Sequence, residues 1–322
     1  MLRYIIRRFL LLIPLVLGIT LISFGTMKLA PGDYFENLKQ NPSIKPQTVE
    51  RLRKDFGLDK PAYVQYGLWL RNIVVRQDFG ESFEYHEPAF QLIKSRLYYT
   101  FILSFWSMIL SWVVAIPLGV YIATHRNGWV DRIANFGAFA GISLPGFFAA
   151  LLALYFAYRT GWFPIGGASS ENYESFTRWG KILDTGRHLF LPVMVLGTGG
   201  IAGLMRQMRG NLLDVLSENY VLAARARGLS NSKVIWKHAV RNAINPLVTL
   251  IGFELSGLLS GAALVENVMS WPGLGRLLLE AVEKQDLYVA MDSFVMGAFL
   301  LILGNLVADI LLVLTDPRIK VQ

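Results

Sequence analysis

Few side chains in this sequence are placed to do chemistry. The chain contains no Cys, which excludes disulfides, thiol catalysis and cysteine-ligated zinc. Its four histidines lie far apart, so no His-based metal cluster is predicted. A phosphate loop needs G-x-x-x-x-G-K-[ST], yet Gly180-Lys181 is followed by Ile182. We therefore expect no catalytic residue, no metal site and no bound cofactor in this chain.

One acidic residue stands out by its position. Glu254 is the single charge inside the apolar stretch Asn242–Val265, and a lone carboxylate is costly in lipid unless it faces water or a partner. It could line a translocation path and meet a cationic amine, or it could be a buried acid that holds helices together. Asp309 is more consistent with a structural role, and Asp292, near the outer surface, needs no special explanation.

A short alanine-rich segment is the most informative stretch. Residues 220–228 read Tyr-Val-Leu-Ala-Ala-Arg-Ala-Arg-Gly, in which Ala favours helix and keeps the surface flat while Gly228 permits a sharp exit. Before it, Arg206–Asn219 is predicted to be a polar helix. After it, Ser230-Asn231-Ser232 can cap a further helix, Lys233–Asn245. A short helix held between two longer ones is a surface suited to binding a partner, although an ordinary basic loop would have a similar composition.

The elements that position these residues are membrane helices. The chain has 322 residues, of which 53% are hydrophobic and only 17% charged, and its mean hydropathy is +0.42. A soluble domain usually has about 25% charged residues. The net charge of +8 could suggest nucleic acid, but this hydropathy points to a polytopic membrane protein in a lipid bilayer, without a nucleic-acid partner.

Six stretches are long and apolar enough to cross a bilayer, which needs roughly 20 residues per helix. They are Phe9–Met27, Leu97–Thr124, Ile133–Tyr158, Leu189–Met205, Asn242–Val265 and Leu287–Thr315. The first resembles a signal peptide, but no small-residue cleavage site follows it, so we expect a retained helix. The predicted fold class is an all-α polytopic membrane protein with six transmembrane helices and a large external loop after the first.

Charge asymmetry predicts the orientation. With the N-terminus inside, the inner segments carry 14 basic and 4 acidic residues, whereas the outer segments carry 16 of each. Basic residues concentrate on the cytoplasmic side, so both termini are expected in the cytoplasm. The predicted domains are a first helix (1–30), an external helical loop (31–96), a five-helix transmembrane domain (97–315) and a cytoplasmic tail (316–322).

The outer loop is predicted to be structured. Pro46 to Phe56 is expected to form an amphipathic helix closed by Gly57, and Pro61–Val75 a second helix rich in Tyr and Trp. The loop could dock an external partner or cap the transmembrane helices.

At the alanine-rich segment the sequence resembles the permease subunits of bacterial ABC importers, whose signature is Glu-Ala-Ala followed four residues later by Gly. Residues 223–229 and 238–246 fit the peptide-importer version. Leu222 replaces the acid of the general signature and the Pro lies further downstream, both of which resemble the dipeptide/oligopeptide branch. Agreement continues in order through residues 1–16 with 30–33, 53–66, 78–82, 265–266 with 271–275, and 316–318. The B-type permease subunit is most resembled.

This resemblance implies the type I importer permease fold in the bacterial cytoplasmic membrane. It also implies a complex with a second homologous permease subunit, two ATP-binding subunits that use ATP and Mg, and an external substrate-binding protein. The helix near 219–232 would couple ATPase closure to the transmembrane helices. The implied coupling residues are Tyr220, Ala223, Ala224, Arg225, Ala226, Arg227, Gly228, His238, Arg241 and Asn242.

Small residues suggest where helices pack. Gly257 and Gly261 form a small-xxx-small face that could meet a partner permease or pack within the subunit. Residues 197, 199, 200 and 203 are all Gly and make the fourth transmembrane helix thin, and Pro145 and Pro192 could kink their helices.

Other cargoes and other classes of membrane protein can be weighed against the same sequence. The importer is expected to carry di- or oligopeptides, but related permeases carry nickel, glutathione or other small solutes. A secondary transporter using Glu254 would need a relay of intramembrane acids and an inverted repeat, and neither is visible. An intramembrane enzyme would need a catalytic constellation that the transmembrane helices lack. A receptor without transport would have no use for a coupling helix.

Overall fold

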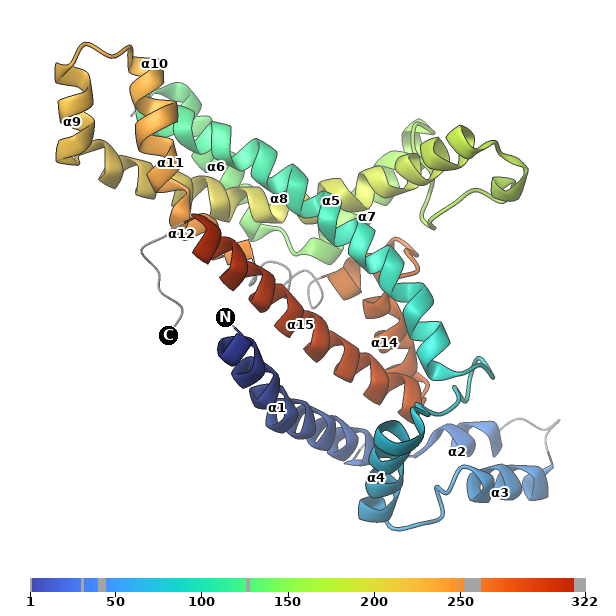
Figure 1. The fold of residues 1–322 in the computed structure, drawn as a ribbon. Helices are drawn as coiled ribbons and strands as arrows, with labels where there is room; N and C mark the ends of the chain where they lie inside the picture. Colours follow the sequence, from blue (N-terminus) through green and yellow to red (C-terminus); the bar gives the residue numbers. More distant parts are fainter. Residues whose placement is uncertain are drawn as a thin grey trace. The chain divides into compact units, whose positions relative to one another are not determined.

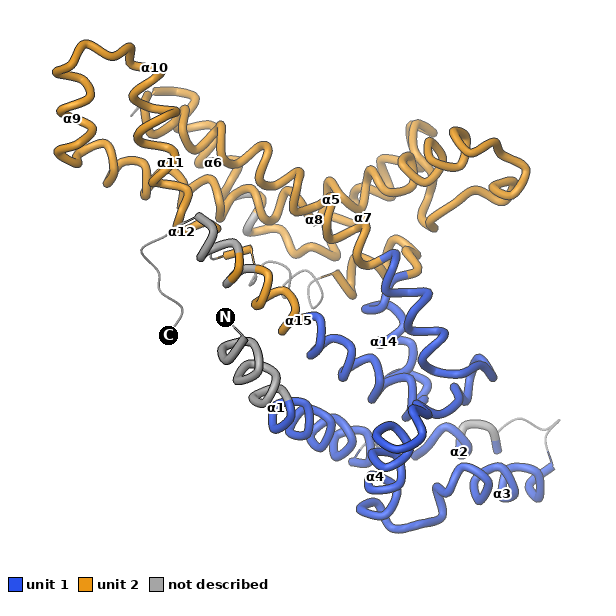
Figure 2. The backbone as a smooth tube through the Cα atoms, in the orientation of Figure 1, with its two compact units in different colours: residues 1–99, 273–300 blue, residues 100–272, 301–322 orange. Residues whose placement is uncertain are grey.

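The computed structural model describes residues 2–29, 32–39, 45–125, 128–248, 250–251 and 262–315. The described chain is mostly helical (Figure 1). It divides into two compact units, unit 1 (residues 1–99 and 273–300) and unit 2 (residues 100–272 and 301–322), which Figure 2 colours separately. The helices α5 (Ala89–Thr124) and α15 (Leu287–Thr315) contribute to both units.

The remaining helices fall within one unit each. Unit 1 also contains α1 (Leu2–Leu29), α2 (Tyr34–Lys39), α3 (Pro46–Asp55), α4 (Ala62–Arg71), η1 (Asn72–Arg76) and α14 (Leu274–Glu283). Unit 2 also contains α6 (Trp129–Ser143), α7 (Gly146–Thr160), η2 (Tyr173–Ser175), α8 (Arg178–Leu216), α9 (Asn219–Ala226), α10 (Asn231–Lys233), η3 (Val234–Ala239), α11 (Val240–Ala243) and α12 (Asn245–Val248).

Four helical stretches in the described part are long and apolar enough to cross a membrane. They are Ile13–Glu36, Ala89–Thr124, Arg178–Leu216 and Leu287–Val307, and α7 is a shorter apolar helix. The predicted all-α membrane class is therefore confirmed. The central part of the predicted fifth transmembrane helix, residues 252–261, lies outside the described residues, and with it Glu254, Gly257 and Gly261.

The prediction that Ile133–Tyr158 forms one continuous transmembrane helix is wrong. It is broken at Leu144-Pro145 into α6 and α7, which have 15 residues each. Pro145 has no backbone N–H, and its ring disfavours the helical conformation of the residue before it. By contrast, Pro117 and Pro192 lie inside the continuous helices α5 and α8.

The predicted helices of the external loop are confirmed, and they share a core with the last helix. Phe35, Val49, Trp69 and Phe83 of the loop are buried together with Met291 of α15. Gly57 follows α3 in a left-handed conformation with φ 67°, as a helix-ending glycine does. The loop is thus a packed part of unit 1 and not a linker.

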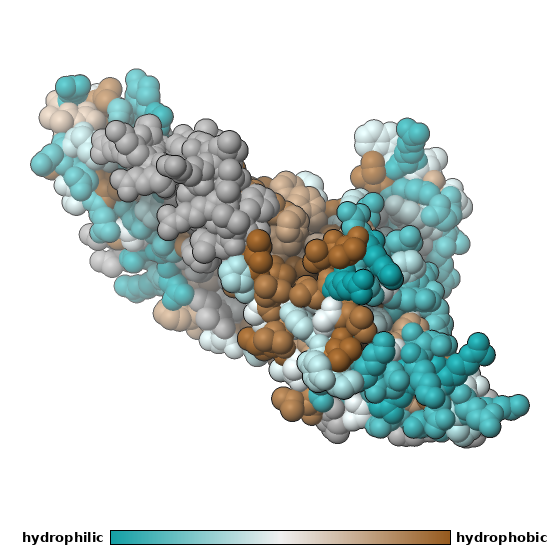
Figure 3. All heavy atoms as spheres, turned by 60° about the horizontal axis from the view of Figure 1, so that its bottom comes forward, coloured by the Kyte–Doolittle hydropathy of each residue, from teal (hydrophilic) through white to brown (hydrophobic). Residues whose placement is uncertain are grey.

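Unit 2 has its largest core around α8. Buried residues of α5 and α8, among them Ile122, Met205 and Met208, form one cluster with Val221 of α9 and Val240 of α11. Many large apolar side chains elsewhere are exposed, such as Leu151 and Tyr155 on α7, and Figure 3 shows hydrophobic side chains gathered on one face beside hydrophilic ones. Exposed apolar surface of this extent is typical of contact with lipid or a partner.

Candidate functional site

The predicted alanine-rich helix is present as α9. The helix α8 ends at Leu216, a turn follows, and α9 runs from Asn219 to Ala226. Val221 and Ala224, one helical turn apart, are buried, with exposed fractions of 0% and 7%. Gly228 then adopts a φ of 76°, which L side chains rarely adopt, so the chain reverses after α9 at a position that needs glycine.

A second helical segment runs back beside α9. It consists of α10, η3 and α11, and Figure 1 shows it next to α9 as the other arm of a hairpin. Ser230 occupies the predicted N-cap position, but its side chain makes no capping hydrogen bond. The buried face of α9 packs in the same cluster as Val234, Ala239 and Val240 of this arm.

One polar contact joins the two arms. The Asn242 Nδ2 atom donates a hydrogen bond to the Tyr220 hydroxyl oxygen at 2.7 Å and lies 3.4 Å from the His238 carbonyl oxygen. Two of the predicted coupling residues, 22 positions apart, are therefore brought together by the fold. Asn211 of α8 adds a bond from its Nδ2 to the Ala243 carbonyl oxygen at 3.1 Å, which ties the second arm to α8.

The rest of the predicted set forms the outer face of the hairpin. Ala223, Arg225, Ala226, Arg227 and Gly228 are exposed, as is Arg241, whereas His238 is half-buried. A Cβ added at Gly228 would meet no atom within 4 Å, so the surface there is open. The exposed surface of α9 combines small residues and arginines with the larger Tyr220 and Leu222, which are 41% and 49% exposed. Such a surface suits contact with another protein, and these residues include no nucleophile or acid–base pair.

Sequence reasoning missed a partly buried ion pair that joins α6 to α8, the helix that precedes this hairpin. Arg209 of α8 lies with its Nη2 atom 3.1 Å from Asp131 Oδ2 of α6, and the Asp131 side chain is only 7% exposed. Asn135 donates from Nδ2 to Asp131 Oδ1 at 2.7 Å. The available signal was one acid and one base, each placed just beyond the predicted cytoplasmic end of a transmembrane helix.

The glycines of α8 have different surroundings. A Cβ at Gly197 would lie 2.7 Å from Leu110 Cδ2 and 3.2 Å from the Ser107 carbonyl oxygen, both on α5. Ser111 of α5 donates from Oγ to the Gly197 carbonyl oxygen at 2.8 Å. Gly199 and Gly203 have no such neighbour within 4 Å. The thin side of α8 therefore faces α5 at selected positions only.

Unit 1 holds a second group of buried polar side chains. Ser82 Oγ donates to Asp286 Oδ2 at 2.6 Å, and burial raises the pKa of Asp286. Trp69 donates from Nε1 to Asp292 Oδ1 at 3.3 Å, and Asp292 is only 2% exposed. The expectation that Asp292 needs no special explanation is thus wrong, because helix α4 covers it.

Two family models account for nearly the whole chain. Residues 115–321 match the family described as "Binding-protein-dependent transport system inner membrane component", and residues 1–104 match the N-terminal part of such membrane components. The chain belongs to this family of permeases. It is therefore a multi-pass component of an inner membrane and a non-catalytic subunit.

Full-length relatives place this permease in the peptide branch. It is 40% identical to the oligopeptide transport system permease protein AppB of Bacillus subtilis, over 98% of this chain and 99% of the relative. It is 33% identical to the dipeptide transport system permease protein DppB of Alkalihalophilus pseudofirmus, over 99% and 100%. It is 36% identical to the glutathione transport system permease protein GsiC of Escherichia coli, over 99% of both.

These relatives confirm the predicted family and the peptide-importer class. Membership in a binding-protein-dependent system implies that this permease works with a separate binding protein and with ATPase subunits. In the part of the permease that the structure describes, no group of three or more His, Asp or Glu residues is arranged to hold a metal ion.

Proposed function

We propose that this permease forms the translocation path for di- and oligopeptides together with a second, homologous permease subunit. Two ATPase subunits bind on the cytoplasmic side, and they alone bind and hydrolyse ATP with Mg. The cargo arrives from an external binding protein. The fold is the six-helix type I importer arrangement, with both termini in the cytoplasm and the five-helix transmembrane domain at 97–315.

The hairpin of α9 with η3 and α11 carries this proposal. Its buried face belongs to the unit 2 core, so a push on the hairpin is transmitted to α8 through packed side chains. Its outer face presents the small residues Ala223, Ala226 and Gly228, where a partner can approach closely. The exposed side chains of Tyr220 and Leu222 lie on the same helix and would contact that partner. Closing of the ATPase pair around this face would then switch the permease between inward-open and outward-open states.

A set of Gly228 variants tests the coupling role. Gly228→Asn adds a side chain that tolerates a positive φ, and Gly228→Glu adds a longer charged one. We expect Gly228→Glu to lower peptide-stimulated ATP turnover and uptake by at least about tenfold, because a side chain at the centre of an interface disrupts the fit. Gly228→Asn should have a smaller effect of the same kind. Both are measured in proteoliposomes that contain the four subunits and the binding protein.

Gly161 provides a matched control. It has a φ of 67°, no atom within 4 Å of an added Cβ, and an exposed position on the proposed outer side. Gly161→Asn and Gly161→Glu should carry the same backbone strain and yet leave ATP coupling intact. Normal peptide uptake by Gly228→Glu at wild-type abundance would contradict the assignment of this helix.

Glutathione is a second candidate cargo. The glutathione permease relative is as similar to this chain as several peptide permeases are, at 36% identity. Uptake of labelled trialanine and of labelled glutathione by the same reconstituted assembly, each with its candidate binding protein, distinguishes the two.

A further inference from the structure

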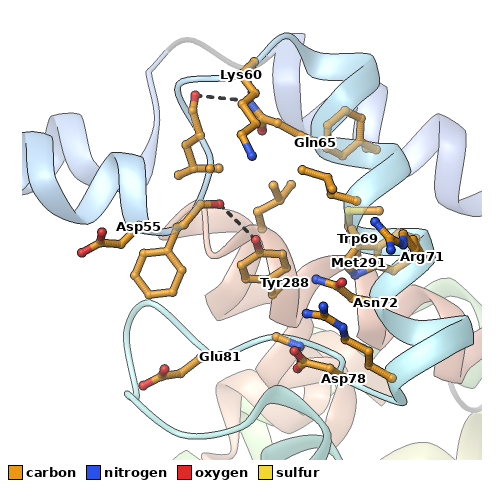
Figure 4. Close-up of a pocket in the computed structure, with 18 of the residues that line it drawn as sticks. Asp55, Lys60, Gln65, Trp69, Arg71, Asn72, Asp78, Glu81, Tyr288 and Met291 are labelled. Carbon is orange, nitrogen blue, oxygen red and sulfur yellow. Dashed lines mark hydrogen bonds between the residues drawn. The ribbon is translucent and has the colours of Figure 1, made fainter.

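Unit 1 contains a pocket whose lining combines the loop after α1 with the start of the last helix, α15. Residues 54–60 and 78–81 lie around it together with α4, η1 and the start of α15 (Figure 4). Its volume is about 590 Å³. Small-molecule sites in proteins usually have about 300–1,000 Å³, so this pocket is large enough for a ligand of several residues.

The floor of the pocket is aromatic and held in place. Trp69, 5% exposed, is fixed by its hydrogen bond to Asp292, and the Tyr288 hydroxyl donates to the Phe56 carbonyl oxygen at 3.3 Å. The backbone of Gly80 packs directly against the Tyr288 ring, because a Cβ added at Gly80 would lie 2.8 Å from Tyr288 Cγ. Gly80 also has a φ of 85°. Trp69 is therefore largely covered, and the half-buried Tyr288 ring is the aromatic surface that is held ready beside the pocket.

The rim carries charges of both signs. Four basic and three acidic residues line the pocket: Lys54, Lys60, Arg71, Arg76, Asp55, Asp78 and Glu81. Across the described ranges, Lys60, Arg71 and Arg76 form no ion pair. Figure 4 places Lys60 and Gln65 at one end of the pocket, Asp78 and Glu81 at the other, and Tyr288 between them. Lys60 at one end and Asp78 with Glu81 at the other thus carry opposite charges, while Arg71 and Arg76 add positive charge at the ends of α4 and η1.

Gln65 fixes the backbone at the Lys60 end of the pocket. Its Nε2 atom donates to the carbonyl oxygens of Lys60 at 2.7 Å and Leu58 at 3.2 Å, which fixes the amide. Its Oε1 atom is buried and has no hydrogen-bond partner among the residues that the structure describes. Lys60 and Gln65 are therefore linked at this end of the pocket, whereas Gln65 Oε1 is closed off from it.

We propose that this pocket binds a short zwitterionic peptide, as a site separate from the central translocation path. The peptide carboxylate faces Lys60, its ammonium group faces Asp78 and Glu81, and a side chain packs against the Tyr288 ring. An inorganic anion would leave the acidic end unmatched, and an apolar solute would leave both ends unmatched. This inference rests on the proposed function, in which peptides reach the permease from the same side.

Binding of trialanine to the purified full chain in lipid nanodiscs tests the proposal, without binding protein or ATPase subunits. The variants are Lys60→Gln and Asp78→Asn. Lys60→Gln keeps the backbone carbonyl of residue 60, so Gln65 can still donate its hydrogen bond to that oxygen. In the second, the amide oxygen of the new side chain can still accept from the Gly80 N–H, which Asp78 Oδ1 binds at 2.9 Å. Each should weaken trialanine binding by about tenfold, as expected for a lost charge-assisted contact.

Blocked peptide and a distant charge serve as controls. N-acetyl-trialanine amide, which lacks both terminal charges, should bind the wild-type chain at least about tenfold more weakly than trialanine and should not distinguish the variants. Lys45→Gln, which removes an exposed charge outside the pocket lining, should leave trialanine binding unchanged.

The outcomes separate this inference from the proposed function. Absence of trialanine binding, equal binding of free and blocked peptide, or wild-type binding by both variants would overturn the pocket assignment, even if the full assembly imports peptides. Variants that weaken docking of the external binding protein but not trialanine binding would overturn it as well. Failure of the wild-type assembly to import any peptide would instead refute the proposed function.

Discussion

At the scale of single residues, polar pairs hold unit 1 together. The Tyr85 hydroxyl donates to Glu280 Oε2 at 2.7 Å, and Arg276 Nε donates to Glu280 Oε1 at 2.7 Å. Burial alone would raise the pKa of Glu280, but these two hydrogen bonds, together with the positive charges of Arg276 and Arg96, outweigh it and hold the pKa below its usual value. Burial and the bond to Glu280 raise the pKa of Tyr85 to about 12.

The lowered pKa of Glu280 predicts a pH-dependent effect of Tyr85→Phe. An acid whose folded pKa is lowered stabilises the fold above its unfolded pKa, near 4.5, and this contribution is lost as pH falls through the folded pKa. Removing the hydroxyl should cost about 1–2 kcal/mol at pH 7, and the difference from wild type should shrink as the pH drops below about 4.

Thermal unfolding in detergent between pH 7 and 3.5 measures this effect. Tyr63→Phe, at a tyrosine that is 78% exposed, is the control and should melt as wild type does at every pH. A Tyr85→Phe deficit that is the same at pH 7 and pH 3.5 would refute the linkage to Glu280.

At the scale of elements, the contact between α5 and α8 depends on which glycines face the partner helix. Gly197 and Gly200 meet α5 closely, whereas Gly199 and Gly203 have open space. The bond from Ser111 to the Gly197 carbonyl oxygen is possible only at this close approach. The four glycines therefore differ in how closely α5 approaches them, and the sequence alone does not distinguish them.

A pair of neighbouring substitutions on α8 tests this difference. Gly197→Ala places a methyl group 2.7 Å from Leu110 Cδ2, and overpacking of this kind costs about 1–3 kcal/mol. Gly199→Ala on the same helix should be neutral or slightly stabilising. Leu110→Ala should recover part of the loss in the Gly197→Ala background, because it frees the space. Equal melting temperatures of Gly197→Ala and Gly199→Ala would show that the approach is not tight.

At the scale of the whole molecule, charge distribution sets the expected orientation. The segments proposed to be cytoplasmic carry 14 basic residues against 4 acidic ones, and the α9 hairpin and its flanks account for half of the basic residues. The same orientation places the peptide pocket of unit 1 on the outer side, where a binding protein would deliver cargo. Both proposed sites thus depend on one topology.

The absence of Cys makes this topology directly measurable. Tyr63→Cys on α4 and Lys237→Cys on η3 each introduce a unique exposed thiol. In right-side-out membrane vesicles, a membrane-impermeant maleimide should label Tyr63→Cys at once and Lys237→Cys only after permeabilisation. Ser169→Cys, at an exposed position in the loop before η2, should behave as Tyr63→Cys does. The reverse labelling pattern would place the α9 hairpin outside and the unit 1 pocket inside, which would contradict both proposed sites.

The amino-acid sequence by itself determined the class of this protein and most of its helices. Apolar runs, charge asymmetry and the 220–228 segment are local signals, because each depends on residue types within one or two helical turns. For the same reason the α9 helix and the reversal at Gly228 could be predicted. The break at Pro145 was only partly foreseen, since Pro117 and Pro192 show that a proline alone does not end a helix.

Contacts between distant segments were decided by the tertiary structure alone. The Tyr220–Asn242 bond and the Asp131–Arg209 ion pair join residues 22 and 78 positions apart, and the unit 1 pocket brings residues 54–60 beside Tyr288 of α15. Nothing in the local pattern says which side of α8 faces α5 or that α4 covers Asp292. Such pairings depend on how buried surfaces pack and form hydrogen bonds with one another in three dimensions. A single sequence shows only that those surfaces exist.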